Sequence, residues 1–350
     1  MSKPKLCFNC ICKNESKCIL ETLNSIYKYI DYWVICDTGS TDNTRELITQ
    51  FFNEKNIPGE LYQDEWQGFD HNFTLMLEKT YNKSDFFIHF DADDLFDGNI
   101  NKDKLDNHVL KYNSQWRRGS ASYEYPVIYN NTVKWVAAGC AHTVYIPIDA
   151  PSNLREVEQL TSFIIESRGV GDRANDSEKF TKDALNLKQQ FFDTLEHDPY
   201  NLNRRSAFYT AQSYKDAGNY QEAIKWYVLY NKLSDAWDEE QFEAHLSLMY
   251  CKIILKYEVN DIINEYNNCI AIFDDRAEPY IDMANYYFDK GNYELSYYNL
   301  KIAQTMDFNQ VKQKYILFVR IDSYGKPIKE FLRKICILTN RNEEAIQLQC

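Results

Sequence analysis

Three aspartates that follow an apolar run form the part of this sequence best suited to chemistry. They lie in Asp91-Ala92-Asp93-Asp94, directly after the strand-like run 86–90. Carboxylates about 4 Å apart repel one another by roughly 4 kcal/mol per pair at an effective dielectric constant of about 20, so they must separate into water, take up protons or share a cation. Such oxygen ligands suit Mg²⁺ or Mn²⁺, ions that commonly arrive bound to phosphate oxygens. The sequence therefore predicts a metal and diphosphate site at this turn.

The composition indicates an acidic globular protein. Its 350 residues are 44% hydrophobic, which is enough for a sizeable core and for two domains. A formal net charge of −13 argues against nucleic acid as the main partner, although a local basic patch could still bind a phosphate. No apolar stretch approaches the roughly 20 residues that span a membrane, and residues 1–6 lack the apolar core of a signal peptide. We therefore expect a cytoplasmic protein without a transmembrane segment.

Cysteines cluster near the start of the chain, at Cys7, Cys10, Cys12 and Cys18. A protein without a secretion signal is expected to keep its thiols reduced. The cluster could bind zinc, but no matching Cys/His pair follows at finger-like spacing, and the first three cysteines lie in an apolar strand pattern. Buried structural thiols are therefore the favoured interpretation.

Strand and helix patterns alternate between Lys5 and Asp94, as a parallel α/β sheet requires. Because crossovers between parallel strands are almost always right-handed, the carboxyl ends of the strands share one edge, and open α/β sheets bind ligands there. The residues expected at that edge are Asn14 and Glu15 after strand 5–12, Asp37 after strand 32–36, and Asp91 to Asp94 after strand 86–90. Helices are expected over 16–30, 43–55 and 70–80, with a short strand near Leu61-Tyr62.

The sequence pattern changes after Asp94, first to a β-hairpin pattern and then to helical repeats. Residues 117–147 predict a β-hairpin that turns at Asn130-Asn131, followed by a strand over 139–146. Residues 204–233 carry Ala, Tyr and Gly at the spacing of a tetratricopeptide helix-turn-helix, and the spacing returns at 284–300 with room for a degenerate repeat around 240–273. Such repeats stack into a solenoid. The expected domains are an α/β domain at 1–180, helical repeats at 181–307 and a C-terminal helical extension at 308–350.

Eight motifs occur in an order and spacing typical of one enzyme family. They are ICKNE at 11–15, VICDTGSTDNT at 34–44, WQGFDHNFT at 66–74, FDADD at 90–94, GCAHT at 139–143, GDRANDSEKFTKDA at 171–184, SAFYTAQSYKDAG at 206–218 and WDEE at 237–240. Together they resemble family 2 glycosyltransferases of the GT-A fold, and more narrowly the subgroup with C-terminal tetratricopeptide repeats. The resemblance implies a GT-A (Rossmann-like) nucleotide-sugar domain followed by an all-α tetratricopeptide-like solenoid.

The resemblance also implies an activity. It is that of a metal-dependent hexosyltransferase, which uses a nucleoside-diphosphate sugar, expected to be a UDP-sugar, with Mn²⁺ or Mg²⁺, and inverts the anomeric centre. The acceptor would be a protein, a peptide or a glycan. Carried over by position, Asp37 contacts the nucleoside, Asp91 its ribose and Asp93 the metal. The resemblance adds His142 as a further candidate ligand beside Asp91 and Asp93, and it places Asn14, Glu15 and Asn72 at the donor.

Two positions depart from the family pattern. Asn72-Phe73 stands where the family commonly has Asn-Arg, so a cationic contact is missing, and His142-Thr143 stands where many relatives have His-Glu. An inverting transferase generally needs a base within hydrogen-bond reach of the acceptor hydroxyl. The sequence leaves this base open among Glu124, Asp149, Glu166 and Asp172, and an acceptor that is already nucleophilic would need none.

Basic and aromatic residues near these motifs have two interpretations. Arg173 and Lys179, with Arg168 and Lys182, could clamp the donor diphosphate, or they could lie in a solvated linker. Trp66 and Trp135 are expected to pack in the protein rather than to serve as platforms for sugars.

Two other classes of function compete with the transferase. The departures at Phe73 and Thr143 suggest a repeat scaffold whose transferase domain has lost its activity. Asp37, Asp91 and Asp93 are intact, which argues against such a loss. A nucleotidyltransferase would normally carry a Gly-rich basic loop near the N-terminus, and CFNCICKNESK is not one. The repeats would bind a protein or peptide acceptor, or a second copy in a homodimer.

Overall fold

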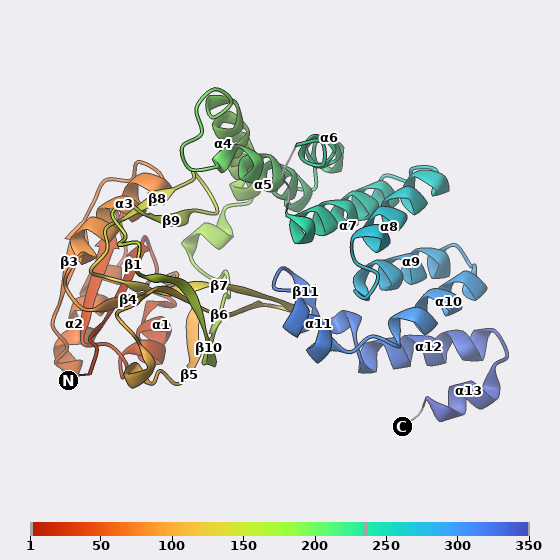
Figure 1. Ribbon diagram of the computed structural model, residues 1–350, viewed down its shortest axis with the longest axis horizontal. Helices are drawn as coiled ribbons and strands as arrows, with labels where there is room; N and C mark the ends of the chain where they lie inside the picture. The colour runs from red at the N-terminus through yellow and green to blue at the C-terminus, as the bar shows by residue number, and fades with distance from the viewer. Residues whose placement is uncertain (1–2, 234–236, 349–350) are drawn as a thin grey trace. The chain divides into compact units, whose positions relative to one another are not determined.

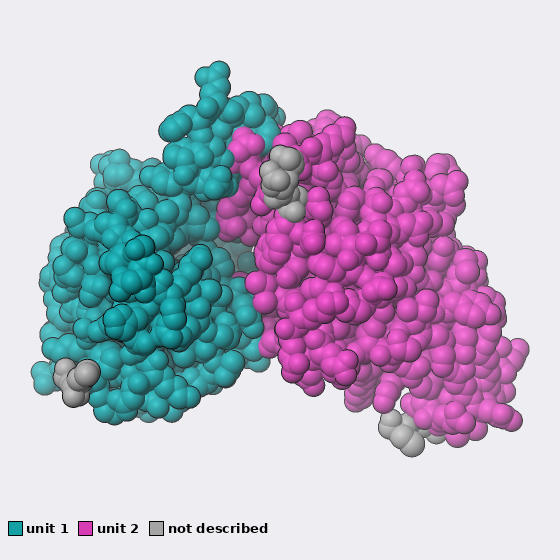
Figure 2. Space-filling view, viewed as in Figure 1, with its two compact units in different colours: residues 1–119, 124–202 teal, residues 120–123, 203–350 magenta. Residues whose placement is uncertain are grey.

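The computed structural model describes residues 3–233 and 237–348 (Figure 1). The chain forms two compact units, which Figure 2 shows in different colours. Unit 1 comprises residues 1–119 and 124–202, and unit 2 comprises residues 120–123 and 203–350. Within the described part of the chain, no helix has the length and apolar character needed to pass through a membrane.

Unit 1 is built on a sheet with the strand order β3-β2-β1-β4-β7-β6-β10-β5. β1 runs parallel to both β2 and β4, β2 runs parallel to β3, and β7 runs antiparallel to β4. A separate antiparallel pair is formed by β8 and β9. The strands are β1 (Leu6–Cys12), β2 (Tyr32–Asp37), β3 (Gly59–Gln63), β4 (Phe86–His89), β5 (Leu95–Gly98), β6 (Val109–Arg118), β7 (Ala121–Asn130), β8 (Trp135–Ala138), β9 (Val144–Pro147) and β10 (Arg155–Glu166).

The helices of unit 1 follow from apolar positions at helical spacing. In α1 (Ile19–Ile26) the residues Ile19, Leu23 and Ile26 recur every three or four positions and are buried, which gives this short helix one apolar face. The other helices are α2 (Thr44–Lys55), α3 (Phe69–Thr80) and α4 (Lys179–Asp193), with short 3₁₀ turns at Lys102–Lys104 and Asp172–Asn175. The predicted alternation of strands and helices up to Asp94 is confirmed, and α1 is shorter than the expected helix over 16–30.

The predicted hairpin lies in a different place. β6 and β7 are neighbours joined through Gly119 and Ser120, whereas Asn130 and Asn131 lead from β7 toward β8, a strand that pairs with β9. The side-chain amide of Asn130 donates to the carbonyl oxygens of Asn107 and Val109, and that of Asn131 donates to the carbonyl oxygen of Thr80. The chain does turn at Asn131 and Thr132, but the hairpin predicted there is wrong, because β8 pairs with β9 rather than with β7 and the two buried amides bind neighbouring backbone.

The clustered cysteines are free, buried thiols. Within residues 3–233 and 237–348 there is no group of three or more His, Cys, Asp or Glu side chains arranged to hold a metal ion. Burial raises the pKa of the thiols of Cys10 and Cys12 well above the usual range, which keeps them protonated. The expectation that these cysteines are buried thiols is confirmed.

The described part of unit 2 is mainly helical. Its helices are α5 (Leu202–Asp216), α6 (Tyr220–Tyr230), α7 (Asp238–Ile254), α8 (Val259–Ile272), α9 (Glu278–Asp289), α10 (Tyr293–Ala303), α11 (Phe308–Lys314), α12 (Lys326–Leu338) and α13 (Asn342–Gln347). Gly218 and Gly291 precede α6 and α10 with φ of 75° and 73°, a conformation that favours glycine. Asn219 and Asn292 then cap these two helices in the same way. The repeated turn bears out the helical repeats of tetratricopeptide type.

A buried ion pair holds an extended segment within unit 2. Arg276 and Glu278 are both 0% exposed, and their side chains approach to 2.9 Å. The Arg276 guanidinium also donates to the carbonyl oxygens of Leu317 and Phe318, while Glu278 accepts the backbone N–H of Arg320 at 3.0 Å. β11 (Val319–Arg320) lies in this segment and pairs with residues 121–122.

The division between the units falls after Leu202 rather than near residue 180. α4 belongs to unit 1, because the Gln190 side chain accepts a 2.7 Å hydrogen bond from the backbone N–H of Cys140, and Asp183 forms an ion pair with Arg173. The residues predicted as a separate extension, 308–350, belong to the same compact unit as the repeats.

Candidate functional site

The carboxyl ends of β1, β2 and β4 lie at one edge of the sheet, because these strands are parallel neighbours. Cys12 pairs with Asp37 in the β1–β2 register, and Asn9 pairs with His89 in the β1–β4 register. The loops that begin with Lys13, Thr38 and Phe90 therefore leave the sheet together. The structure thus brings the predicted donor-side residues Asn14, Glu15, Asp37 and Asp91 to one edge, as expected for an open α/β sheet.

Asp37 anchors the turn that follows β2. One of its carboxylate oxygens accepts the backbone N–H groups of Gly39 and Ser40 at 3.1 and 3.0 Å, and the other accepts the thiol of Cys12 at 3.8 Å. Gly39 has a φ of 105°, which an L side chain would strain. The carboxylate is buried, so any contact with a nucleoside would be made in addition to its role in the turn.

Asn14 and Glu15 link the first loop to two others. The Asn14 side-chain oxygen accepts the backbone N–H of Thr41 at 2.8 Å, and its amide nitrogen lies 3.5 Å from a carboxylate oxygen of Asp172. Glu15 accepts the thiol of Cys18 at 3.0 Å. Burial raises the pKa of the Glu15 carboxyl, and the nearby charge of Asp93 acts in the same direction.

The acidic turn is held by the segment Arg168–Asp172, which lies far from it in sequence. The backbone N–H of Gly171 donates to a carboxylate oxygen of Asp93 at 2.8 Å, and the backbone N–H of Arg168 donates to Asp94 at 3.0 Å. The Arg168 side chain reaches the carbonyl oxygen of Asp93 at 2.7 Å and forms an ion pair with Glu21. These contacts fix the orientation of both carboxylates.

Asp94 and Asp91 differ in their surroundings. Asp94 is buried, and one of its carboxylate oxygens has no hydrogen-bond partner. Burial, followed by the charges of Asp91 and Asp93, raises the pKa of Asp94 to about 8. Asp91 is open to solvent on one side, yet desolvation by the protein around it, together with the charge of Asp93, raises its pKa to about 6. The charges of Arg173 and Arg118 oppose this rise.

Of the predicted clamp residues, Arg173 approaches the acidic turn. Its guanidinium forms an ion pair with Asp183 and lies 4.9 Å from the ring centre of Phe69. Its charge acts on the carboxyl of Asp91. Lys179 lies at the start of α4 with its amine 4.8 Å from the ring centre of Phe180. Arg173 is therefore well positioned for an anion, and Lys179 lies close enough to act on Asp183.

His142 does not join the aspartates. It lies between β8 and β9 with an exposed side chain and a φ of 51°, and Thr143 donates to the carbonyl oxygen of Gly139. Among the described residues, no three His, Cys, Asp or Glu side chains are arranged to hold an ion. The expected set of Asp91, Asp93 and His142 is thus not assembled. Two carboxylates still fit Mg²⁺ or Mn²⁺, because such ions usually take one or two carboxylates and complete their shell with water and substrate phosphates.

The Asn72-Phe73 pair has a structural role. The fully buried Asn72 side chain accepts the backbone N–H of Gln67 and donates to the carbonyl oxygen of Glu65, both at 2.9 Å. Phe73 packs against His89 with ring centres 5.3 Å apart, and against Tyr145 at 5.9 Å. The cation missing from position 73 is therefore replaced by an aromatic cluster.

The two tryptophans near these motifs have different environments. Trp135 is 5% exposed and packs as expected. Trp66 is 42% exposed, yet its ring packs against Phe69 in a T-shaped arrangement with ring centres 4.8 Å apart. Its two neighbours in sequence, Glu65 and Gln67, are bound by the Asn72 side chain, which ties this loop to α3.

The candidate bases lie in four different places. Asp172 follows Gly171 directly and lies beside Asn14. Glu124 lies on β7, beyond the positions that pair with β4, in the direction of the acidic turn. Glu166 lies 3.6 Å from Arg117 at the end of β10. Asp149 follows β9 and accepts the backbone N–H of Lys134 at 2.9 Å, which places it away from the Arg168–Asp172 segment.

Two residues of the site were missed by the sequence reasoning. Gly171 positions Asp93, and a Cβ at this glycine would lie 2.7 Å from a carboxylate oxygen of Glu15. Arg118 ends β6, and its charge acts on Asp91. The sequence signal for Arg118 is the basic pair Arg117-Arg118 just before Gly119. Arg118 can be placed at the site from this signal only if the hairpin turn is placed at Gly119 and Ser120.

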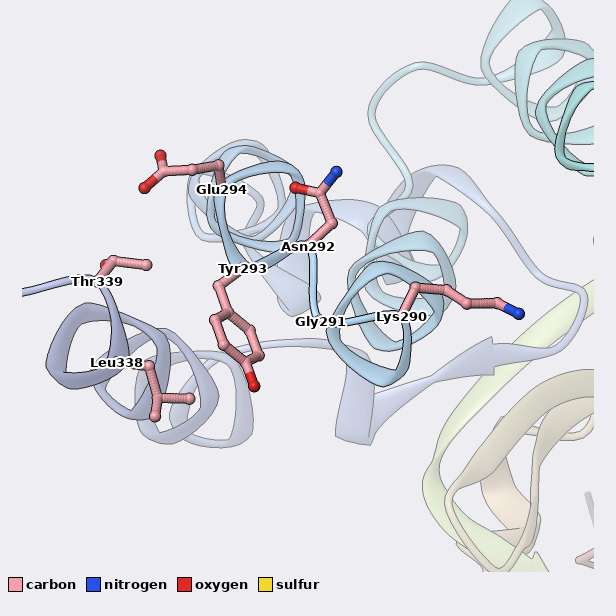
Figure 3. Close-up of a pocket in the computed structure, with 7 residues that line it drawn as sticks. All are labelled: Lys290, Gly291, Asn292, Tyr293, Glu294, Leu338 and Thr339. Carbon is pink, nitrogen blue, oxygen red and sulfur yellow. The ribbon is translucent and has the colours of Figure 1, made fainter.

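A shallow pocket of about 480 Å³ lies in unit 2 (Figure 3). It is lined by Lys290, Gly291, Asn292, Tyr293, Glu294, Leu338 and Thr339, and Tyr293 points toward Leu338 while Lys290 points away. Its carboxylate, Glu294, is bound by Arg341. The pocket therefore offers no group that is poised for catalysis.

Residues 10–109 match glycosyl transferase family 2. They include the acidic turn, Asn14, Glu15, Asp37 and Asn72. The chain therefore carries a family 2 glycosyltransferase domain of the α/β class. In the same chain, helical repeats of tetratricopeptide type follow this domain.

Solved structures show low overall similarity, and no curated protein matches the chain. S. aureus TarS 1-349 in complex with UDP-GlcNAc has 12% identity, covers 76% of this chain and 90% of that chain, and has a TM-score of 0.34. MamA has 15% identity, covers 49% and 88%, and has a TM-score of 0.35. A Podosopora anserina putative kinesin light chain with nearly identical TPR-like repeats has 15% identity, covers 50% and 85%, and has a TM-score of 0.36.

Proposed function

We propose that this protein is a metal-dependent hexosyltransferase. It would move a sugar from a UDP-sugar to a protein, peptide or glycan acceptor with inversion. The observation that carries the proposal is the placement of Asp91 and Asp93 at the carboxyl edge of the sheet, inside the residues that match family 2. Asp91 and Asp93 would hold Mg²⁺ or Mn²⁺, which, when bound, supplies positive charge to the diphosphate leaving group.

The chain's own residues would orient the donor. The N–H of Gly171 and the Arg168 side chain fix the acidic turn, so that Asp93 does not have to reorganise when the donor arrives. Arg173, held between Phe69 and Asp183, would contact the diphosphate, and Lys179 would add charge from α4. Asn14, Glu15 and Asp37 would line the nucleoside side, while Asn72 would act only by holding the Glu65–Gln67 backbone.

Asp172 is the base that the site supports best. It is exposed, and its neighbours in sequence are Gly171, which binds Asp93, and Arg173. In an inverting transfer the acceptor hydroxyl would give its proton to Asp172, its oxygen would attack the anomeric carbon, and the bond to the diphosphate oxygen would break. Asp172→Asn is expected to lower kcat by about 100-fold or more without changing affinity for UDP. Glu124→Gln is the comparison variant, and a larger loss there would transfer the role of base to Glu124.

The function itself is tested by titration calorimetry with UDP and MnCl₂, and by release of UDP from a panel of UDP-sugars. Wild-type protein should bind UDP only with metal, and Asp93→Ala should abolish turnover while retaining the unfolding temperature. Asp97→Ala, in the exposed part of β5, is the control. Normal turnover by Asp93→Ala would refute the assignment.

The second candidate function is a repeat scaffold with a decayed transferase domain, which the burial of Phe73 in an aromatic cluster favours. It predicts no binding of UDP with Mn²⁺ to the wild-type protein. In either case we propose a cytoplasmic location, because the described thiols are free, and a role for the helical repeats in holding an acceptor or a second copy.

A further inference from the structure

Arg118 ends a strand that reaches the same sheet edge as the acidic turn. β6 runs parallel to β10, with Arg117 paired to Glu166, and the backbone N–H of Ser167 donates to the carbonyl oxygen of Arg117 at 2.8 Å. The next residue of that segment, Arg168, binds Asp93 and Asp94. The end of β6 is therefore connected to the acidic turn by a backbone hydrogen bond to Ser167 and by the hydrogen bonds of Arg168 to Asp93 and Asp94.

The Arg118 guanidinium lies beside Gly169 in the Arg168–Asp172 segment. One of its nitrogens is 3.5 Å from the point where a Cβ of Gly169 would be, and Gly169 has a φ of 59°. Gly169 itself is two residues before Gly171, which binds Asp93. Arg118 therefore lies beside the loop whose backbone binds Asp93.

Arg118 differs from the other arginines beside this segment. Arg117, Arg168 and Arg173 each form an ion pair with a carboxylate, namely Glu166, Glu21 and Asp183. The exposed side chain of Arg118 makes no hydrogen bond or ion pair within the part of the chain that the structure describes. A guanidinium that is free to form two parallel hydrogen bonds is well suited to a phosphate.

The acidic character of the site is the reason why a bound diphosphate would need an additional cation. The protein has a net charge of −13, and three aspartates stand at the turn where a diphosphate is proposed to bind. Position 73, where the resemblance implies a cation, holds a packed phenylalanine. A diphosphate therefore needs positive charge from other parts of the sheet edge, and Arg118 and Arg173 both lie beside the loop that binds Asp93.

We propose that Arg118 binds the diphosphate of the nucleotide donor together with Arg173. This inference rests on the proposed transferase function and assigns Arg118 a direct contact with substrate. It supplies the cation that Phe73 cannot provide. The ligand class is a nucleoside diphosphate, and the contact is to its terminal phosphate rather than to its base.

The test compares UDP with UMP, which shares the nucleoside but lacks the terminal phosphate. Titration calorimetry with MnCl₂ is carried out on the full chain as wild type, Arg118→Ala and Arg118→Lys. Arg118→Ala should weaken UDP binding at least tenfold and UMP binding less than threefold. The affinity of Arg118→Lys for UDP should lie between those of wild type and Arg118→Ala, because lysine keeps the charge without the planar guanidinium. Arg155→Ala, at the other end of β10 in an ion pair with Asp106, is the control and should bind as wild type does.

Each alternative outcome has a distinct meaning. Equal affinities of Arg118→Ala and wild type for UDP would overturn the role of Arg118 and leave the transferase proposal intact. Equal losses for UDP and UMP would also overturn it, because the effect would then lie in the nucleoside pocket or in the fold. If wild-type protein binds neither nucleotide with metal, the proposed function fails and the role of Arg118 fails with it.

Discussion

Gly171 donates its backbone N–H to a carboxylate oxygen of Asp93 at 2.8 Å, across a long separation in sequence. The bond joins the loop after β10 to the turn after β4. Because Arg168 in the same loop also binds this turn, the loop cannot move without releasing Asp93 or Asp94. The position of the proposed metal ligand therefore depends on a segment outside the residues that match the family.

Gly171→Ala tests this dependence. Gly171 has a φ of −64°, an ordinary value, but a Cβ there would lie 2.7 and 2.9 Å from the carboxylate oxygens of Glu15. The loop is expected to shift away from Asp93, and UDP affinity with Mn²⁺ should fall about tenfold, or roughly 1.4 kcal/mol. Gly218→Ala, in open space at a φ of 75° in unit 2, is the control for backbone strain alone. Unchanged affinity in Gly171→Ala would show that the loop does not position Asp93.

Phe73→Arg is expected to destabilise the protein rather than to restore a cation. Phe73 is buried against Phe69, His89 and Tyr145, so a guanidinium there would lose water without gaining a carboxylate. The expected loss is about 3–5 kcal/mol in the free energy of unfolding, measured in urea. Phe73→Leu removes volume but adds no charge, so its free energy of unfolding should fall by less than that of Phe73→Arg. A Phe73→Arg protein that is both stable and more active would show that the cluster has room for the cation.

Asp94→Asn should change the pH dependence of stability. The pKa of Asp94 in the folded protein is raised to about 8, above the usual value of 3.8, so the unfolded chain gives up this proton first as pH rises. The stability of the wild type should therefore decrease as pH rises from about 4 through about 8. Asparagine does not ionise. The Tm of Asp94→Asn minus the Tm of the wild type should therefore increase by at least about 2 °C between pH 5 and pH 9. A difference that does not vary with pH would contradict the raised pKa.

Arg276→Met should strongly destabilise unit 2. The substitution leaves Glu278 fully buried without its cation, and the carbonyl oxygens of Leu317 and Phe318 lose their donors. We expect the free energy of unfolding to fall by about 3–5 kcal/mol. Thermal unfolding monitored by circular dichroism measures this loss. Lys326→Met is the matched control, because its 3.6 Å pair with Glu330 is exposed and should contribute less than about 1 kcal/mol. Equal effects of the two substitutions would show that the buried pair does not hold the extended segment.

Several features could be predicted because they depend on local periodicity. The alternation of strands and helices up to Asp94, the shared edge of β1, β2 and β4, and the repeated turns at Gly218 and Gly291 all follow from residues close in sequence. The hairpin turn could not be predicted in this way. Asn130 and Asn131 have the composition of a turn, but their amides bind backbone at Asn107 and Thr80, which is a long-range contact.

Which carboxylates lie at the sheet edge follows from the order of residues along the chain, because a residue that directly follows a parallel strand has little freedom in where it lies. What surrounds those carboxylates depends on the folded arrangement of the loops. Asp93 is bound by Gly171, Asp91 is influenced by Arg118 and Arg173, and among the described residues His142 does not complete a three-residue metal site with the two aspartates. These relations depend on how loops from separate strands fold over one another, and residue spacing carries no information about those approaches.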